Sequence, residues 1–414
     1  DYQDGTGADS TEHRTAAIDA YSKAIAMNDR AARVWLNLGI NFVTRASHPD
    51  NRDAEGDLAR AASAFEKGRA LDSGNVVTFF YSGEVHAELA HRLRDRGGDP
   101  APELTLALTS YRKGLSLAPA LPHLHNGVGG VLMDQAALAW DHGESPDALL
   151  TEARAAFEKA ISVAPDQGYG YNNVGAALTQ LASYQSIRGD DIESSAPAAA
   201  AATREALARI PNHAALWGNL ARIHAIVAAH RLAQGRDPGA AVAAASEAIE
   251  KALAGNPNDP EILVYRAEIL GLAARWKARG RGGDPRDFDA VSEAFRSGLD
   301  QKPKSQEYPM LFARFCFEWA SWDATRNKDP EPALSTGTTV VRAVLEARPR
   351  WAEAIALRGG LSLVKARSAG EPVERREHAA RAARDLRAAV SENANLEHLW
   401  GGARKVAEQL AGAR

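Results

Sequence analysis

The sequence predicts an all-α fold, an α-solenoid of about nine helical hairpins. Side-chain types recur along the chain at a spacing close to 46 residues, and each recurrence holds two segments long enough for a helix. A short unit that repeats over all 414 residues outweighs the usual expectation of two or three separate domains. Apolar residues make up 45% of the chain, which is enough for a continuous core.

Two recurring positions define the shorter helix of each unit. The first of these positions lies inside the helix, and the second, eight residues later, is a proline. The proline is expected to end the helix, because proline cannot continue it. The first position is mostly aromatic or aliphatic and recurs at steps of 44 to 46: Tyr21, Phe65, Tyr111, Phe157, Thr203, Ile249, Phe295, Val341 and Leu386. The prolines recur at an unbroken step of 46: Pro119, Pro165, Pro211, Pro257, Pro303 and Pro349.

Two further positions define the longer helix. A small residue lets two helices approach closely, and the bulky residue four positions earlier is expected to fill the space between helices. The small residues are Gly39, Gly83, Gly129, Gly175, Ala221, Ala267, Ala313 and Gly359. The mostly bulky ones are Trp35, Phe79, His125, Tyr171, Trp217, Leu263, Pro309, Ile355 and Trp400.

Strong N-cap residues mark the start of the shorter helix. Aspartate and serine accept hydrogen bonds from the unpaired amides of a helix start, and the proline that often follows suits the first turn. The capping residues are Asp9, Asp53, Asp99, Ser145, Asp191, Asp237, Asp284 and Asp329. Each unit is therefore expected to hold two helices, for example Pro238 to Ala254 and His213 to Gln234.

We expect residues 1–8 to form an irregular N-terminal segment and residues 9–414 to form a single solenoid. Residues 1–8 match the loop between units, and every unit needs neighbours to bury its faces, so we expect the chain to belong to a longer protein. The expected units lie near residues 9–52, 53–98, 99–144, 145–190, 191–236, 237–283, 284–328, 329–373 and 374–414.

The pattern resembles the tetratricopeptide repeat (TPR) along nearly the whole chain. The closest matches to its signature are Trp35-Leu36-Asn37-Leu38-Gly39 and the segment from Phe157 to Pro165. The resemblance implies a right-handed superhelix whose concave groove, lined by the longer helices, binds a protein or peptide segment. The unit of 46 residues exceeds the usual length of about 34, which predicts extended helices.

Loops such as Gly235-Arg236-Asp237-Pro238 and the Ala/Arg-rich composition are similar to the C-terminal repeat regions of myxobacterial-type serine/threonine protein kinases. This resemblance implies the non-catalytic part of a bacterial signalling protein. The chain itself has no glycine-rich loop leading to a strand lysine, no His-Arg-Asp catalytic loop and no Asp-Phe-Gly motif. We therefore expect this chain not to be an enzyme.

Charge and cysteine content exclude several classes of partner. A net charge of −4 gives no field that attracts nucleic acid or an anionic membrane. The single cysteine, Cys316, excludes an internal disulfide and a multi-thiolate metal site and is compatible with a reducing compartment. We expect a cytoplasmic chain with no cofactor, no metal, no small-molecule substrate, no nucleic-acid partner and no membrane contact.

Asparagines close to the recurring small residue of the longer helix are the candidate binding residues. We call this recurring position the small column. The TPR resemblance implies that such asparagines face the groove, where an amide can both donate to and accept from a peptide backbone. The alternative is that they only cap or solvate a helix. The candidate peptide-binding residues are Tyr169, Asn172, Asn173, Asn219 and Arg222.

Two other sets suggest partner chemistry. Glu261, Glu307 and Glu353 recur 46 residues apart and could select a cationic partner. The aromatic run Phe312, Phe315, Phe317, Trp319 and Trp322 occupies more than one helix face, so part of it belongs to the core and any exposed remainder is a docking patch. The alternative functions are a nucleic-acid-binding helical repeat and the regulatory solenoid of another enzyme.

Overall fold

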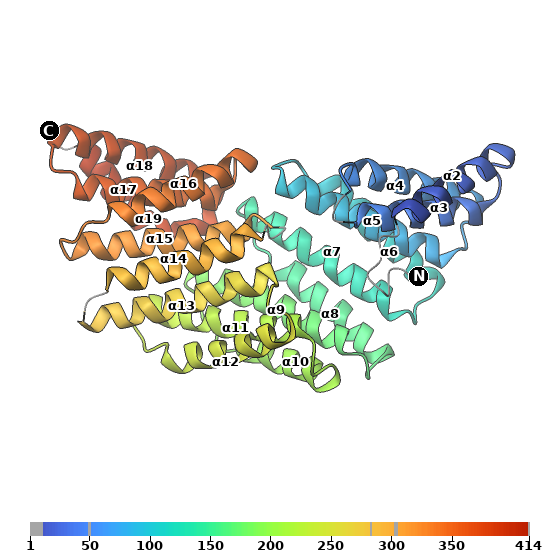
Figure 1. Cartoon of the computed structure of the whole chain (residues 1–414), viewed down its shortest axis with the longest axis horizontal. Coiled ribbons are helices and arrows are strands. Elements are labelled where there is room, and N and C mark those ends of the chain that lie inside the picture. The colour runs from blue at the N-terminus through green and yellow to red at the C-terminus, as the bar shows by residue number, and fades with distance from the viewer. Residues whose placement is uncertain (1–10, 49–50, 282–283, 302–304, 413–414) are drawn as a thin grey trace. The chain divides into compact units, whose positions relative to one another are not determined.

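The computed structural model describes residues 11–48, 51–281, 284–301 and 305–412. Over these residues the chain forms 18 α-helices in sequential hairpins and one short 3-10 helix (Figure 1). The predicted all-α solenoid of about nine TPR-like hairpins is confirmed. The expected segment 1–8, the cap Asp9 and the proline Pro303 lie outside the described residues.

Each hairpin pairs an even-numbered helix with the odd-numbered helix that follows it. The even-numbered helices are α2 (Thr11–Met27), α4 (Ala54–Leu71), α6 (Ala101–Leu117), α8 (Asp147–Val163), α10 (Ser195–Arg209), α12 (Gly239–Gly255), α14 (Pro285–Asp300), α16 (Glu331–Ala347) and α18 (Pro372–Glu392). The odd-numbered helices are α3 (Ala32–Ala46), α5 (Val76–Asp95), α7 (Pro122–Asp141), α9 (Gly168–Arg188), α11 (Ala214–Ala233), α13 (Pro260–Arg281), α15 (Glu307–Thr325), α17 (Ala352–Ser368) and α19 (Glu397–Gly412), with η1 (Ala394–Leu396) before α19.

The capping and proline columns set the ends of the even-numbered helices. The carboxylates of Asp99, Asp237 and Asp329 accept hydrogen bonds from the backbone N–H two residues later, at 3.0, 2.7 and 2.9 Å. Asp53 makes no such bond and instead pairs with Arg60 at 3.0 Å. The described prolines of the second column each follow two residues after a helix end: Pro119, Pro165, Pro211, Pro257 and Pro349.

The small column receives the bulky first-column side chain of the next unit. A Cβ atom added at Gly83 would lie 2.5 Å from Cε1 of Tyr111, so no larger residue fits without a shift of the ring. Gly129 is filled in the same way by the ring of Phe157. This contact joins the odd-numbered helix of one hairpin to the even-numbered helix of the next.

The bulky column has a role that the sequence did not predict. The indole N–H groups of Trp35 and Trp217 donate to the carbonyl oxygens of Asp29 and Pro211, at 2.7 and 3.0 Å. Both side chains are half-buried. At these positions the indole closes the turn within its own hairpin, and Trp35 also packs against the core between the helices, as predicted.

The chain divides into two compact units. Unit 1 comprises Asp1–Arg94, Gly98–Gln135 and Ala155–Ala164, and unit 2 comprises Asp95–Gly97, Ala136–Arg154 and Pro165–Arg414.

Unit 1 contains a buried carboxylate held by three donors. Asp57 is 1% exposed and accepts two hydrogen bonds from Arg45, at 2.6 and 2.7 Å, and others from Asn51 and Arg60. Burial raises the pKa of Asp57, but the hydrogen bonds outweigh it and hold the pKa below the usual value. The network ties α3 to α4 beside the core that surrounds Phe65.

In unit 2 the odd-numbered helices form a closed ring. Each of α9, α11, α13, α15, α17 and α19 contacts the next, and α19 returns to contact α9. The even-numbered helices α10, α12, α14, α16 and α18 pack against this ring as a second layer. An open solenoid has two free ends, so closure distinguishes unit 2 from a simple groove.

Polar contacts over long sequence distances hold the ring closed. Asn393, 1% exposed, donates to the carbonyl oxygen of Trp140 at 2.7 Å. The indole N–H of Trp140 donates to Glu353 at 2.8 Å, and Arg348 pairs with Asp141 at 3.1 Å. Trp140 and Asp141, the last two residues of α7, thus bind the C-terminal hairpins within unit 2.

The close packing of the small column predicts opposite effects at two adjacent glycines of α7. Gly129→Ala is expected to lower the free energy of unfolding by about 1–3 kcal/mol, because the added methyl group meets the buried ring of Phe157. Gly130 has nothing within 4 Å of an added Cβ, so Gly130→Ala is expected to raise it by about 0.5–1 kcal/mol through helix propensity. Urea unfolding followed by circular dichroism measures both, and equal stabilities would contradict this account.

Loss of the Asn393 contact is expected to weaken ring closure. Asn393→Ala removes one of the two donors to the carbonyl oxygen of Trp140, the other being the N–H of Gly143, and should cost about 0.5–1.5 kcal/mol of unfolding free energy. Asn258→Ala, in an exposed loop, is the matched control and should change it by less than about 0.5 kcal/mol. Amide hydrogen exchange in η1 should also accelerate in N393A alone, and unchanged exchange there would show that Asn393 does not hold the closure.

Candidate functional site

Three of the candidate asparagines lie together on two neighbouring helices of the ring. Asn219 of α11 donates from Nδ2 to Oδ1 of Asn172 of α9 at 2.9 Å. Asn172 in turn donates to Oδ1 of Asn173 at 3.4 Å. All three side chains are half-buried. Among the described residues Asn219 keeps its Oδ1 and one N–H group without a partner, which are the two groups needed to pair with a peptide bond.

The other two candidates extend this row in both directions. Tyr169 is 55% exposed and lies one helical turn before the two asparagines of α9. Arg222 lies one turn after Asn219 on α11, with its guanidinium carbon 5.8 Å from the ring centre of Tyr265. We call these five residues, Tyr169, Asn172, Asn173, Asn219 and Arg222, the amide strip. Its role in binding stays a prediction.

Arg222 also lines a cavity of about 110 Å³, here called the arginine cavity. Its polar walls come from α9, α11, α13 and α15: Ser183, Ser186, Arg222, Tyr265, Glu268, Glu307, Tyr308 and Arg314. The phenol groups of Tyr265 and Tyr308 lie 3.5 Å apart across two of these helices.

A larger cavity of about 240 Å³, here called the ring cavity, shares six lining residues with the arginine cavity: Ser186, Ile187, Ala229, Glu268, Leu311 and Arg314. Five helices of the ring, α9, α11, α13, α15 and α19, contribute to its walls, together with Phe295 of α14. The C-terminal helix supplies Leu399 and Trp400, so this cavity depends on the closed ring. It combines apolar walls with charged groups, the usual composition of a ligand site.

Three charged residues occupy one position in successive units. Arg222, Glu268 and Arg314 lie 46 residues apart and are half-buried. Among the described residues, none of their side chains makes a hydrogen bond or an ion pair within 4.0 Å. Burial raises the pKa of Glu268, which the two arginines lower in part. Sequence analysis missed this column, although its step of 46 could have revealed it.

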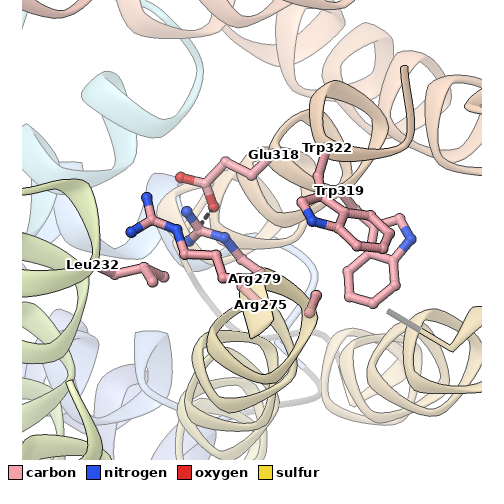
Figure 2. A pocket seen from close by; sticks show the side chains of 7 residues that line it. Leu232, Arg275, Arg279, Glu318, Trp319 and Trp322 are labelled. Atoms are coloured by element: carbon pink, nitrogen blue, oxygen red, sulfur yellow. Dashed lines mark ion pairs between the residues drawn. The ribbon is translucent and has the colours of Figure 1, made fainter. Parts of the chain in front are cut away.

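A third cavity of about 160 Å³ lies at the C-terminal ends of α13 and α15 (Figure 2). Trp319 and Trp322 stand on one side and the guanidinium groups of Arg275 and Arg279 on the other, with Arg275 paired to Glu318 at 2.5 Å. We call it the tryptophan pocket.

The aromatic run divides between core and cavity, not between core and an exposed docking patch. Phe312, Phe315 and Trp319 are 2%, 4% and 3% exposed and belong to the core. The half-buried remainder lies inside unit 2: Phe317 lines the ring cavity and Trp322 lines the tryptophan pocket. These two residues therefore line cavities and do not form an outer docking patch.

The glutamate column is divided too. Glu353 is half-buried and bonded to the indole of Trp140, and burial raises its pKa. Glu261 and Glu307 are exposed. Only these first two members lie where a cationic partner could reach them directly.

Within the described part of the chain, no group of three or more His, Cys, Asp or Glu side chains could hold a metal ion. No helix among the described residues is both long and apolar enough to cross a membrane. Cys316 is fully buried, and burial raises the pKa of its thiol.

No family model and no curated protein matches the chain. Among solved structures, it is similar to a tetratricopeptide repeat protein from Parabacteroides merdae ATCC 43184, with 15% identity, 80% of this chain and 97% of that chain covered, and a TM-score of 0.43. It is also similar to YrrB, described as a TPR protein with an unusual peptide-binding site, with 17% identity, 60% of this chain and 98% of that chain covered, and a TM-score of 0.35. A third similar structure is the APC/C hetero-tetramer Cut9–Hcn1, with 13% identity, 95% of this chain and 58% of that chain covered, and a TM-score of 0.49. The hairpin architecture itself identifies the chain as a TPR-like helical repeat protein.

Asp323, buried beside Trp319, predicts a pH dependence of stability. Burial and then the charge of Asp329 raise its pKa to about 6 from an ordinary 3.8, against the opposing charge of Lys328. The folded chain thus holds a proton that the unfolded chain has released, so Asp323 destabilises the fold increasingly as pH rises from 4 to 6. Asp323→Asn should remove about 2–3 kcal/mol of this loss. Urea unfolding at pH 4 and pH 7.5 measures it, with the exposed Asp289→Asn as control. Parallel behaviour of D323N and the unmodified chain would refute the assignment.

Proposed function

We propose that this chain is a non-catalytic binding module that holds a protein or peptide segment against the inner face of unit 2. The observation that carries the proposal is the amide bridge between Asn172 and Asn219, which runs toward Arg222 and the cavities. TPR-like repeat proteins generally bind peptides or proteins, which supports the proposal.

The amide strip suits recognition of a backbone more than of a sequence. Asn219 can offer one donor and one acceptor to a peptide bond, which every sequence supplies. Its orientation is fixed by Asn172 before the partner arrives, so little side-chain entropy is lost on binding. Specificity then has to come from neighbouring side chains such as Tyr169 and Arg222, which are types common at binding hot spots.

We also propose that the module serves a larger cytoplasmic signalling protein such as a serine/threonine kinase. The similarity of the Gly-Arg-Asp-Pro loops and the Ala/Arg-rich composition to repeat regions of such kinases supports this assignment. In that setting the module would recruit a substrate or regulator to the catalytic domain.

Affinity capture from lysate of the source cells tests the amide strip. The triple variant Asn172→Ala, Asn173→Ala and Asn219→Ala should lose partners that the unmodified chain retains, because it removes every amide of the strip. A loss of at least tenfold is expected, equivalent to about 1.4 kcal/mol.

The matched control replaces two exposed loop amides, Asn212→Ala and Asn258→Ala. This variant should capture the same partners as the unmodified chain, and circular dichroism should show equal helix content in all three proteins. If the triple variant folds and keeps every partner, binding does not use the amide strip.

A further inference from the structure

The ring cavity contains charges that the protein leaves unpaired. Arg314 lines both the ring cavity and the arginine cavity, yet it has no hydrogen-bond or ion-pair partner among the described residues. A guanidinium has five N–H donors and stays charged at all working pH values. Withdrawing it from water without an acceptor is unfavourable. A bound acceptor would remove this cost.

The position of the charges favours an anion as that acceptor. Of the arginines lining the two cavities, Arg275 pairs with Glu318, whereas among the described residues no carboxylate lies within 4.0 Å of Arg222 or Arg314. Glu268, Glu307 and Glu353 act on these two arginines only from a greater distance. The N–H groups of Arg314 are therefore available to a bound anion.

The rest of the cavity wall is apolar. Phe317 and Trp400 pack against each other with ring centres 5.1 Å apart, and Leu399 beside them is 48% exposed. An apolar surface of this kind gains from burial against a hydrocarbon group. The ligand needs an apolar body as well as an anionic group.

The volume limits the size of this body. A cavity of about 150 Å³ accommodates benzene, and drug-sized ligands occupy about 300–1,000 Å³. The 240 Å³ of the ring cavity lies between these values and fits a single aromatic ring or a short alkyl chain joined to a small polar group.

We propose that the ring cavity is a binding site for a small amphiphilic carboxylate, with the carboxylate held by Arg314 and the apolar body against Phe317, Leu399 and Trp400. This site is separate from the amide strip and adds an effector site to the proposed binding module. Residues of both α9 and α19 line it, so the ligand binds the closed ring in preference to an open one. Occupancy therefore stabilises closure.

The probe for this proposal is 3-phenylpropanoate, which carries one ring, a short chain and a carboxylate. Its neutral amide, 3-phenylpropanamide, has the same apolar body. Isothermal titration calorimetry with the whole chain should show the carboxylate binding at least about tenfold more tightly than the amide, because only the carboxylate forms a charge-assisted bond with Arg314. Slower amide hydrogen exchange in α19 on addition of the carboxylate is the second expected result.

Two variants and one control assign the binding to this cavity. Arg314→Gln should weaken 3-phenylpropanoate binding at least about tenfold and leave the amide nearly unaffected. Ala403→Phe, which fills the apolar end, should abolish binding of both while retaining helix content. Arg266→Gln, an exposed arginine on α13, should bind like the unmodified chain.

The proposal fails if the carboxylate does not bind at millimolar concentration, if the amide binds equally well, or if R314Q binds normally. If A403F unfolds, R314Q and the amide still decide the question. The test is independent of the proposed peptide site, because the triple asparagine variant should retain carboxylate binding and R314Q should retain protein partners. Each hypothesis can therefore fail alone.

Discussion

The contact on which the architecture depends is the packing of a bulky side chain onto a helix that has no side chain, or only a methyl group, at that point. In unit 1 the ring of Tyr111 lies against Gly83 and the ring of Phe157 against Gly129. In unit 2 the side chains of Thr203 and Leu386 contact Gly175 and Gly359 in the same way. Because the contact joins successive hairpins and recurs at a nearly constant step, it fixes a similar displacement from each hairpin to the next. Such a constant displacement is what curves the odd-numbered helices of unit 2 into a ring.

The features that sequence alone predicted are those that repeat and act locally. Helix starts at Asp99 and Asp237, helix ends before proline, and the spacing of the small residues each involve contacts within one hairpin or between neighbours. Ring closure, in contrast, depends on contacts between residues that are far apart in the sequence. Trp140 meets Glu353 and Asn393 across 213 and 253 residues, and these residues belong to no repeated column that pairs them. Whether they meet depends on the rotation from each hairpin to the next, summed over many hairpins. A small change in the rotation per hairpin would therefore separate these residues.

The candidate site shows the same division. The asparagines were found because Asn173 and Asn219 occupy one position of the repeat, 46 residues apart. The bond across the two helices joins Asn219 to Asn172, the neighbour of Asn173. The ring cavity was not found, because Leu399 and Trp400 reach it only after closure. The charges at Arg222, Glu268 and Arg314 did carry a signal, since half-buried positions of a repeat are rarely charged without a reason.

Ring closure also affects how a ligand can bind to unit 2. In an open solenoid a ligand fills a groove whose shape it can adjust, and the ends of the solenoid are free. In unit 2 the walls of the ring cavity include residues of α9 and α19, the two helices that meet where the ring closes. The buried polar bonds at the closure, such as Asn393 to Trp140, are lost together if the ring opens. The helix α9 therefore takes part in three features of unit 2: ring closure, the wall of the ring cavity and, through Asn172, the amide strip.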